Sequence, residues 1–178
     1  MIFVTVGTHE QPFDRLLRAV DDMKARGVIV EDVHMQTGWS TYEPTHCSWS
    51  PMLSWQDMRT NFDQARIIVS HGGPSTFMEA VARGKTPIVM PRLSRYGEHV
   101  NDHQNDFVQS IARQYGSIIP VSDEQELEYA IRNYDRLTSA TSGITPHNAE
   151  FCRRFSMLVD DLLDDVRPHS PRAPKGDR

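Results

Sequence analysis

Short apolar runs that alternate with helical patterns constrain the fold of this chain more than any other feature. Four such runs span residues 2–6, 33–36, 67–69 and 88–90, and a fifth spans residues 117–121. Between them, apolar residues recur with the spacing of amphipathic helices. Runs that are apolar throughout are typical of strands buried on both faces. The pattern therefore predicts an α/β protein with a Rossmann-like, doubly wound parallel sheet.

Helices are expected between these runs, from apolar spacing and capping signals. Ser122 is expected to cap the last of them, with Gln125 in the capping-box position. Residues 38–51 are polar and aromatic and are expected to form a loop with a short strand. The expected helices cover residues 12–27, 56–65, a segment running through Val81, 101–115 and 122–137.

The chain is expected to form one main domain, residues 1–138, which suits a length of 178 residues. Residues 139–166 are expected to be a linker and an amphipathic helix, whose apolar face either packs back on the domain or docks a partner. Residues 167–178 combine prolines with basic residues and are expected to be a disordered tail.

Composition excludes several classes of protein. The 19 basic and 24 acidic residues give a net charge of −5, which argues against a general nucleic-acid binder. Apolar runs stay well short of the roughly 18 residues that a membrane helix needs, and the first residues do not fit a signal peptide. Cys47 and Cys152 are too far apart for a Cys-x-x-Cys site. A cytoplasmic protein is therefore expected.

Polar, glycine-containing segments follow the expected strands at residues 7–9, 38 onward, 71–75 and 92–99. The carboxyl ends of parallel strands meet at one edge of the sheet, where such folds bind ligands. His71-Gly72-Gly73-Pro74-Ser75 follows a buried strand and opens a helix, a setting in which glycines let a phosphate approach free N–H groups. The alternative is that these glycines only serve tight turns.

Glu79 lies four residues after Ser75, so its side chain can face the same edge of the sheet. A carboxylate placed there can accept hydrogen bonds from two ribose hydroxyls, while the loop holds phosphates. The alternative is a solvated glutamate on a helix surface.

These motifs, taken in order, resemble the donor-binding half of GT-B glycosyltransferases, and in particular the glycosyltransferase family 28 C-terminal domain. The resemblance covers about residues 1–137 and implies a single half of the C-terminal type. Residues 3–9 are similar to the start of stand-alone catalytic subunits, namely the small subunit of the eukaryotic dolichol-linked UDP-N-acetylglucosamine transferase and bacterial exopolysaccharide subunits of the PssE and EpsF type. The motifs are residues 70–80, Gly84-x-x-Pro87, Pro91 and Glu98-His99-x-x-Asp102-His103-Gln104.

The resemblance also implies roles for individual residues. Gly7 and Thr8 would line the diphosphate, Ser54 and Trp55 the uracil, and residues 71–76 the phosphates. Asp102, Gln104 and Asn105 would contact sugar hydroxyls. The donor-binding set is Gly7, Thr8, Ser54, Trp55, His71, Gly72, Gly73, Ser75, Thr76, Glu79, Glu98, His99, Asp102, Gln104 and Asn105.

The function implied is the UDP-sugar-binding catalytic subunit of a two-component inverting glycosyltransferase that needs no metal or other cofactor. Its partners would be a UDP-sugar, a lipid-diphosphate-linked acceptor of polysaccharide synthesis, and a membrane-anchored acceptor-binding subunit. That subunit would recruit the chain to the cytoplasmic face of the membrane. The alternatives are a non-catalytic nucleotide-binding accessory or regulatory module, and a different α/β enzyme such as an epimerase fragment.

Three further features have more than one interpretation. His9 is either the general base or a phosphate contact, because histidine titrates near neutrality. His99 and His103 are spaced like a metal pair on a helix, but they also suit contacts to sugar or phosphate, or a solvated face. Trp39, Trp49 and Trp55 suit the core, a nucleobase platform, an acceptor surface or a subunit interface.

Overall fold

The computed structural model describes residues 1–139. The expected linker, the apolar helix of residues 139–166 and the tail of residues 167–178 fall almost wholly outside the described residues. Seven helical segments and six strands make up the described part. The helices are α1 (Asp14–Ala25), α2 (Trp55–Gln64), α3 (Pro74–Ala82), the 3-10 helix η1 (Ser94–Tyr96), α4 (His103–Tyr115), α5 (Glu124–Arg132) and α6 (Tyr134–Ser139).

The six strands form one sheet in which every neighbouring pair is parallel, in the order β3-β2-β1-β4-β5-β6. The chain therefore winds outward from β1 in one direction and from β4 in the other, which confirms the predicted doubly wound α/β fold. Ile2 of β1 lies beside Val33 of β2 and Ile67 of β4. The strands are β1 (Ile2–Thr5), β2 (Val33–Gln36), β3 (Ser48–Ser50), β4 (Ile67–His71), β5 (Ile88–Met90) and β6 (Ile119–Pro120).

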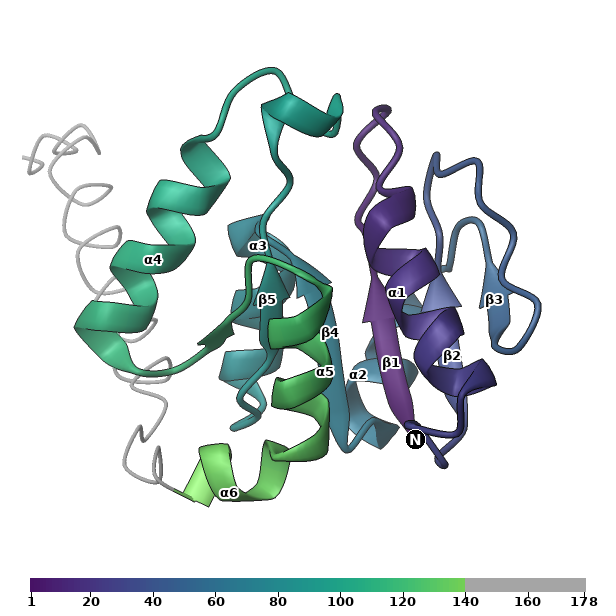
Figure 1. Cartoon of the computed structure of the whole chain (residues 1–178). Helices are drawn as coiled ribbons and strands as arrows, with labels where there is room; N and C mark the ends of the chain where they lie inside the picture. The colour runs from purple at the N-terminus through teal and green to yellow at the C-terminus, as the bar shows by residue number, and fades with distance from the viewer. Residues whose placement is uncertain (140–178) are drawn as a thin grey trace, which may run out of the picture. The chain divides into compact units, whose positions relative to one another are not determined.

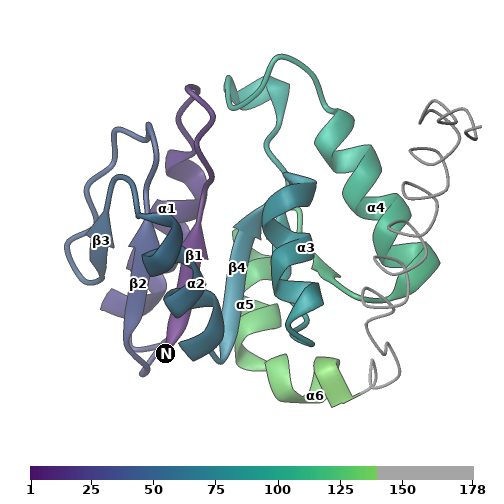
Figure 2. The ribbon, with the colours of Figure 1, turned by 180° about the vertical axis from the view of Figure 1, so that it is seen from behind.

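Helices cover both faces of the sheet because its strands are apolar on both sides. α1 and α5 lie on the face turned toward the viewer in Figure 1, and α2 and α3 lie on the opposite face, seen in Figure 2. Alternate residues of β1 divide accordingly: Ile2 and Val4 pack in the cluster with α1 and α5, whereas Phe3 packs with Phe62 and Ala80 of α2 and α3.

The segment expected to be a single helix over residues 122–137 is two helices, with Asn133 between α5 and α6. Its N-cap is Asp123 rather than Ser122. The Asp123 carboxylate accepts a hydrogen bond from the N–H of Glu126, and the Glu126 carboxylate accepts one from the N–H of Ser122. This variant of a capping box, in which Glu126 binds the N–H of the residue before the N-cap, starts one residue later than the sequence pattern suggested.

Each helix in the described part of the chain is too short or too polar to cross a bilayer.

Candidate functional site at the switch point of the sheet

The strand order reverses between β1 and β4, so the segments that follow these two strands diverge and leave a crevice at their carboxyl ends. Residues 6–13 follow β1, and the turn at residues 72–73 joins β4 to α3. The loop after β1 and the segment containing η1 lie side by side at the upper edge of the sheet in both views (Figures 1 and 2). This is the edge on which the sequence places its polar segments.

Gln36, the last residue of β2, fixes the turn after β1. Its buried side chain accepts hydrogen bonds from the hydroxyl of Thr5 and the N–H of Gly7, and donates to the carbonyl oxygen of Gly7. The side-chain amide of Gln36 thus binds both the N–H and the carbonyl group of Gly7, as the backbone of a neighbouring strand would. Gly7 has φ +76°, a conformation that favours glycine. Its N–H is engaged internally, so Gly7 shapes the site rather than offering a free donor.

The imidazole of His71 fills the space between the two glycine turns. A Cβ atom at Gly7 would lie 2.5 Å from His71 Cε1, and one at Gly73 would lie 2.2 Å from His71 Nε2. Both glycines are therefore required by the buried ring itself, a reason that neither sequence interpretation included. Burial, together with the charge of Arg92, lowers the pKa of His71 to about 4, so the ring is neutral at physiological pH.

The N-terminus of α3 is arranged differently from those of the other described α-helices. Its N-cap is Gly73, which provides no side-chain cap, and Pro74 occupies the first turn. The first turn of α3 has no acidic residue, whereas the first turns of α1, α2, α4, α5 and α6 each contain at least one. The partial positive charge of this helix end is thus left uncompensated and suits an anion.

Two adjoining cavities open beside this helix end. The first has a volume of about 380 Å³, within the range of small-molecule sites. The second has a volume of about 250 Å³ and shares Met58, Ser75 and Thr76 with the first. The first is lined by Thr5, Gly7, Thr8, His9, Gln36, Met52, Leu53, Met58, His71, Ser75 and Thr76, and the second by Trp55, Met58, Arg59, Phe62, Ser75, Thr76 and Glu79.

Trp55 and Glu79, which the resemblance assigns to uracil and ribose, line the second cavity together. Trp55 begins α2 and is 72% exposed, with the guanidinium of Arg59 4.6 Å from the centre of its ring. The Glu79 carboxylate is half-exposed and pairs with Arg83, which is also bound by Asp63. A large aromatic face and a carboxylate therefore lie at one end of the site, and the glycine turns lie at the other.

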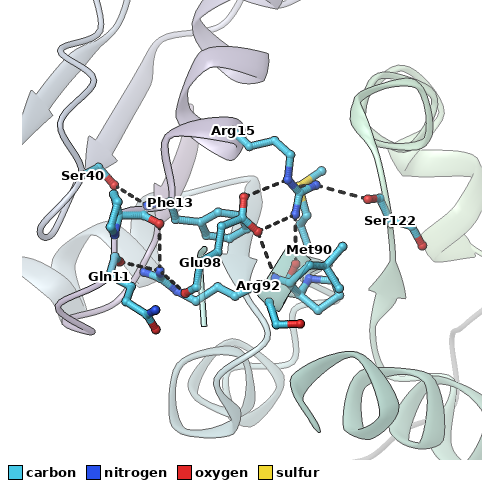
Figure 3. Close-up of polar contacts among 12 residues, drawn as sticks. Gln11, Phe13, Arg15, Ser40, Met90, Arg92, Glu98 and Ser122 are labelled. Atoms are coloured by element: carbon cyan, nitrogen blue, oxygen red, sulfur yellow. Dashed lines mark hydrogen bonds and ion pairs between the residues drawn. The ribbon is translucent and has the colours of Figure 1, made fainter. Parts of the chain in front are cut away.

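Arg92, which follows β5, is completely buried and joins several loops (Figure 3). Its guanidinium donates to the carbonyl oxygens of Val6, Gln11 and Glu98. Burial lowers the pKa of Arg92 to about 10, against the opposing charge of Glu98, so the side chain remains a cation at neutral pH. A fixed positive charge therefore lies beneath the loop that contains His9.

Glu98 lies under the same loops and pairs with Arg15 of α1 through two hydrogen bonds of 2.9 and 3.0 Å (Figure 3). It also accepts the N–H of Leu93. Both carboxylate oxygens are thus occupied inside the protein. This places Glu98 in the framework of the site, outside both cavities.

Three histidines from separate segments meet at the outer end of the first cavity. The ring centres of His9 and His99 are 4.8 Å apart, and those of His99 and His103 are also 4.8 Å apart. His9 lines the cavity, and the other two continue away from it. Among residues 1–139, no group of three or more histidine, cysteine, aspartate or glutamate side chains has an arrangement that could hold a metal ion.

The remaining residues of the donor-binding set are not among those that line the two cavities. Ser54 is the N-cap of α2, and its hydroxyl accepts the N–H of Asp57. Asp102 accepts the N–H of Ser94, which together with nearby positive charge lowers its pKa. Gln104 is buried against Gly72 and accepts the N–H of Arg92. Asn105 follows in the first turn of α4 and is partly exposed.

The three tryptophans differ in burial. Trp49 is half-buried against the core, whereas Trp39 and Trp55 are 60% and 72% exposed. Gln36, Arg92 and Arg15 are the site residues that sequence reasoning missed. Gln36 carried a signal, because a polar residue at the end of a buried parallel strand faces the binding edge. Arg15 carried none, since its partners are distant in the sequence.

Comparisons with known proteins give one family match and two similar solved structures. The family model described as the glycosyltransferase family 28 C-terminal domain matches residues 1–136. No curated protein gives a significant match. Among solved structures, the glycotransferase of kitacinnamycin is 16% identical over 78% of this chain and 38% of its own, with a TM-score of 0.46. The glycosyltransferase SnogD from Streptomyces nogalater is 17% identical over 88% of this chain and 43% of its own, with a TM-score of 0.48. The chain thus spans about two fifths of each of these proteins.

Proposed function

The chain belongs to the glycosyltransferase family 28 C-terminal domain family, and from that membership we propose that it is the UDP-sugar-binding catalytic subunit of a two-component inverting glycosyltransferase. In this proposal, a hexose passes from UDP to a lipid-diphosphate-linked acceptor in polysaccharide biosynthesis. The acceptor is held by a separate membrane-anchored subunit, which brings the chain to the cytoplasmic face of the membrane.

The observation that carries the donor site is the pair of adjoining cavities at the switch point. Trp55 and Glu79 at one end suit a nucleobase and a ribose. The bare N-terminus of α3 and the neutral His71 lie where phosphates attached to that nucleoside would extend. Preorganised N–H groups at this position stabilise a departing diphosphate, so the leaving group needs no metal in this proposal.

The hydrogen bonding of His9 favours a phosphate contact over a general base. Its Nδ1 accepts the N–H of Gln11 at 3.2 Å, so the neutral ring carries its hydrogen on Nε2. The free end of the ring is then a donor, which suits a phosphate oxygen. A general base would need an unshared electron pair facing the acceptor hydroxyl. We therefore assign the base to the acceptor-binding subunit.

Exposed apolar side chains around the same edge support a covering partner. Trp39 follows β2, Met52 follows β3, and Tyr96 and Val100 follow β5, with exposed fractions of 60%, 45%, 54% and 76%. Apolar and aromatic residues gathered at one edge are typical of interfaces. A subunit bound here would close the site over the donor.

Titration calorimetry of UDP into the purified chain, with chelator present, tests the donor site. Glu79→Ala is expected to weaken binding about tenfold or more, because hydrogen bonds to a charged group contribute roughly 1.5–3 kcal/mol each. Asp63→Ala is the matched control, since it removes the other carboxylate that binds Arg83 and leaves the cavity wall unchanged. Absence of UDP binding by the wild type would overturn the proposal.

A non-catalytic nucleotide-binding module is the second candidate, because the same cavities serve it equally well. The two candidate functions differ in whether sugar is transferred. With the acceptor-binding subunit and acceptor supplied, a catalytic subunit moves labelled sugar from UDP to lipid, and that activity falls with the Glu79→Ala loss of binding. Binding of UDP without transfer in the complete system would favour the accessory module.

A further inference from the structure

His9, His99 and His103 come from three separate segments and meet in one row, which is an unusual arrangement for side chains that repel when charged. His9 lies in the loop after β1, His99 follows η1, and His103 begins α4. The row starts in the wall of the first cavity at His9 and leads outward. At the opposite end of the two adjoining cavities lie Trp55 and Glu79.

The tautomers of the rings follow from their backbone contacts. Nδ1 of His9 accepts the N–H of Gln11, and Nδ1 of His99 accepts the N–H of Asn101. Both neutral rings therefore carry hydrogen on Nε2 and offer it as a donor. His103 is the reverse: its Nδ1 faces Asn101 Oδ1, which also accepts the backbone N–H of His103. Its Nε2 then has an unshared electron pair and can accept a proton without breaking a contact.

The surroundings of His99 disfavour its charged form when no anion is bound. Burial, the neighbouring His9 and His103, and the charge of Arg92 all lower the pKa of His99. His71 on β4 lies behind the row and is neutral for similar reasons. The facing acid is Asp102 at the start of α4, whose charge interacts with His99 and Arg95. The negative charge of Glu98 has little effect on these rings, because Arg15 already pairs with it.

We propose that His9, His99 and His103 form an imidazole cluster that binds the terminal phosphate of a nucleoside diphosphate and takes up a proton from solvent as this anion binds. The proposal rests on the donor site proposed above. A nucleoside held by Trp55 and Glu79 directs its phosphates along the cavity toward His9, so the last phosphate reaches the row. The negative charge of that phosphate attracts a protonated imidazole. This attraction offsets the repulsion that a protonated ring meets from its neighbours.

The cluster adds something that the bare end of α3 does not supply. A helix N-terminus attracts anions without taking up a proton, whereas an imidazole gains its charge only with a proton. Affinity for a nucleoside diphosphate should therefore increase as the pH falls through the range in which histidines titrate, by up to tenfold per pH unit for each proton taken up.

Calorimetric titration of UDP in buffers of different ionisation enthalpy, at pH 7.5 with chelator present, measures the protons taken up on binding. The wild type is expected to take up more protons than His103→Gln and His99→Gln. Any proton released by UDP itself is the same for all three proteins and cancels in the comparison. His46→Gln is the control, because His46 is exposed and contacts Asp21, away from the cavities. It should match the wild type.

A second arm compares UDP with UMP, which lacks the terminal phosphate. Proton uptake should disappear with UMP in the wild type. From pH 8 to pH 6, the gain in UDP affinity should be about fivefold or more larger for the wild type than for the His99→Gln/His103→Gln double variant. If UDP binds but proton uptake is equal in all variants, or equal for UMP, the cluster proposal is wrong and the donor site stands. If UDP does not bind, both proposals fail.

Discussion

Gly7 and Gly73 approach the His71 ring from two sides, and this contact determines what either position tolerates. Gly7→Ala is expected to lower the free energy of unfolding by about 3 kcal/mol: roughly 1–2 kcal/mol for a side chain at positive φ, and the rest for displacing the imidazole. Gly27→Ala is the matched control, because Gly27 has φ +71° and open space around its Cβ position. Urea unfolding should show a loss near 1 kcal/mol there. Equal losses at both positions would show that His71 does not constrain Gly7.

His71 also makes stability depend on pH. Because its pKa in the folded protein is about 4, against 6.5 as the ordinary value, the unfolded chain takes up a proton first as the pH falls. Stability is therefore unaffected by this group above pH 6.5 and decreases toward pH 4, by about 2 kcal/mol at pH 5. Urea unfolding at pH 7 and pH 5 measures how much free energy of unfolding is lost on acidification. That loss should be about 2 kcal/mol smaller in His71→Asn than in the wild type. A loss of the same size in both proteins would contradict the lowered pKa.

The sequence indicated where the glycines are but not what they contact. A histidine followed by two glycines after a buried strand predicted a ligand-facing turn, and Gly7 predicted a second one. That the His71 ring lies against Gly7 is a contact between residues far apart in the chain. No local pattern encodes it. Arg92 is the extreme case, since an arginine after a strand indicates an exposed loop, yet this side chain is completely buried.

At the scale of elements, the N-terminus of α3 keeps its positive end free at a cost to helix stability. Ser75→Glu places an acid in that first turn and is expected to stabilise the protein by about 0.3–1 kcal/mol, as acids do at other helix starts. The same charge should weaken UDP binding about tenfold or more by repelling phosphate. Thermal unfolding and calorimetry measure the two effects.

Gln125→Glu is the matched control, because it adds the same charge to the first turn of α5, away from both cavities. It should leave UDP affinity unaltered and stabilise the protein less than Ser75→Glu, because Asp123, Glu124 and Glu126 already place negative charge at that helix start. If Ser75→Glu and Gln125→Glu affect affinity equally, the end of α3 is not the phosphate site.

Elements with continuous apolar runs were predictable to within a few residues, and elements set by capping were not. The core strands lie close to their expected ranges because burial on both faces leaves a clear pattern. The break at Asn133 and the start of α5 at Glu124 depend on which polar side chain reaches a backbone N–H. Asp123 and Ser122 both suit that role, and only the surrounding geometry decides between them.

In the whole molecule, the two halves of the doubly wound sheet are joined above the switch point by side chains rather than by strand pairing alone. Arg15 on α1 donates to Glu98 and to the carbonyl oxygens of Pro91 and Ser122 (Figure 3). These partners are 83, 76 and 107 residues away in the chain. The apolar pattern could predict the layers of this fold, but not such an interaction between its halves.

Arg15→Met tests the importance of this interaction. The substitution keeps an extended side chain and removes every donor, which leaves the buried Glu98 carboxylate without its ion pair and with only the more distant charge of Arg92. The free energy of unfolding should fall by about 3 kcal/mol, because a buried charge that loses its partner is costly. Arg18→Met is the control on the same helix: Arg18 is exposed and lies over the Tyr42 ring, so its loss should cost less than about 1 kcal/mol. Adding Glu98→Gln to Arg15→Met should recover part of the stability, since it removes the unpaired charge.

Equal small losses for Arg15→Met and Arg18→Met would mean that strand pairing alone holds the halves together. If instead Arg15→Met is the more harmful and also weakens UDP binding, the Arg15–Glu98 pair positions the loops at residues 6–13 and 92–99 as one unit over the donor site.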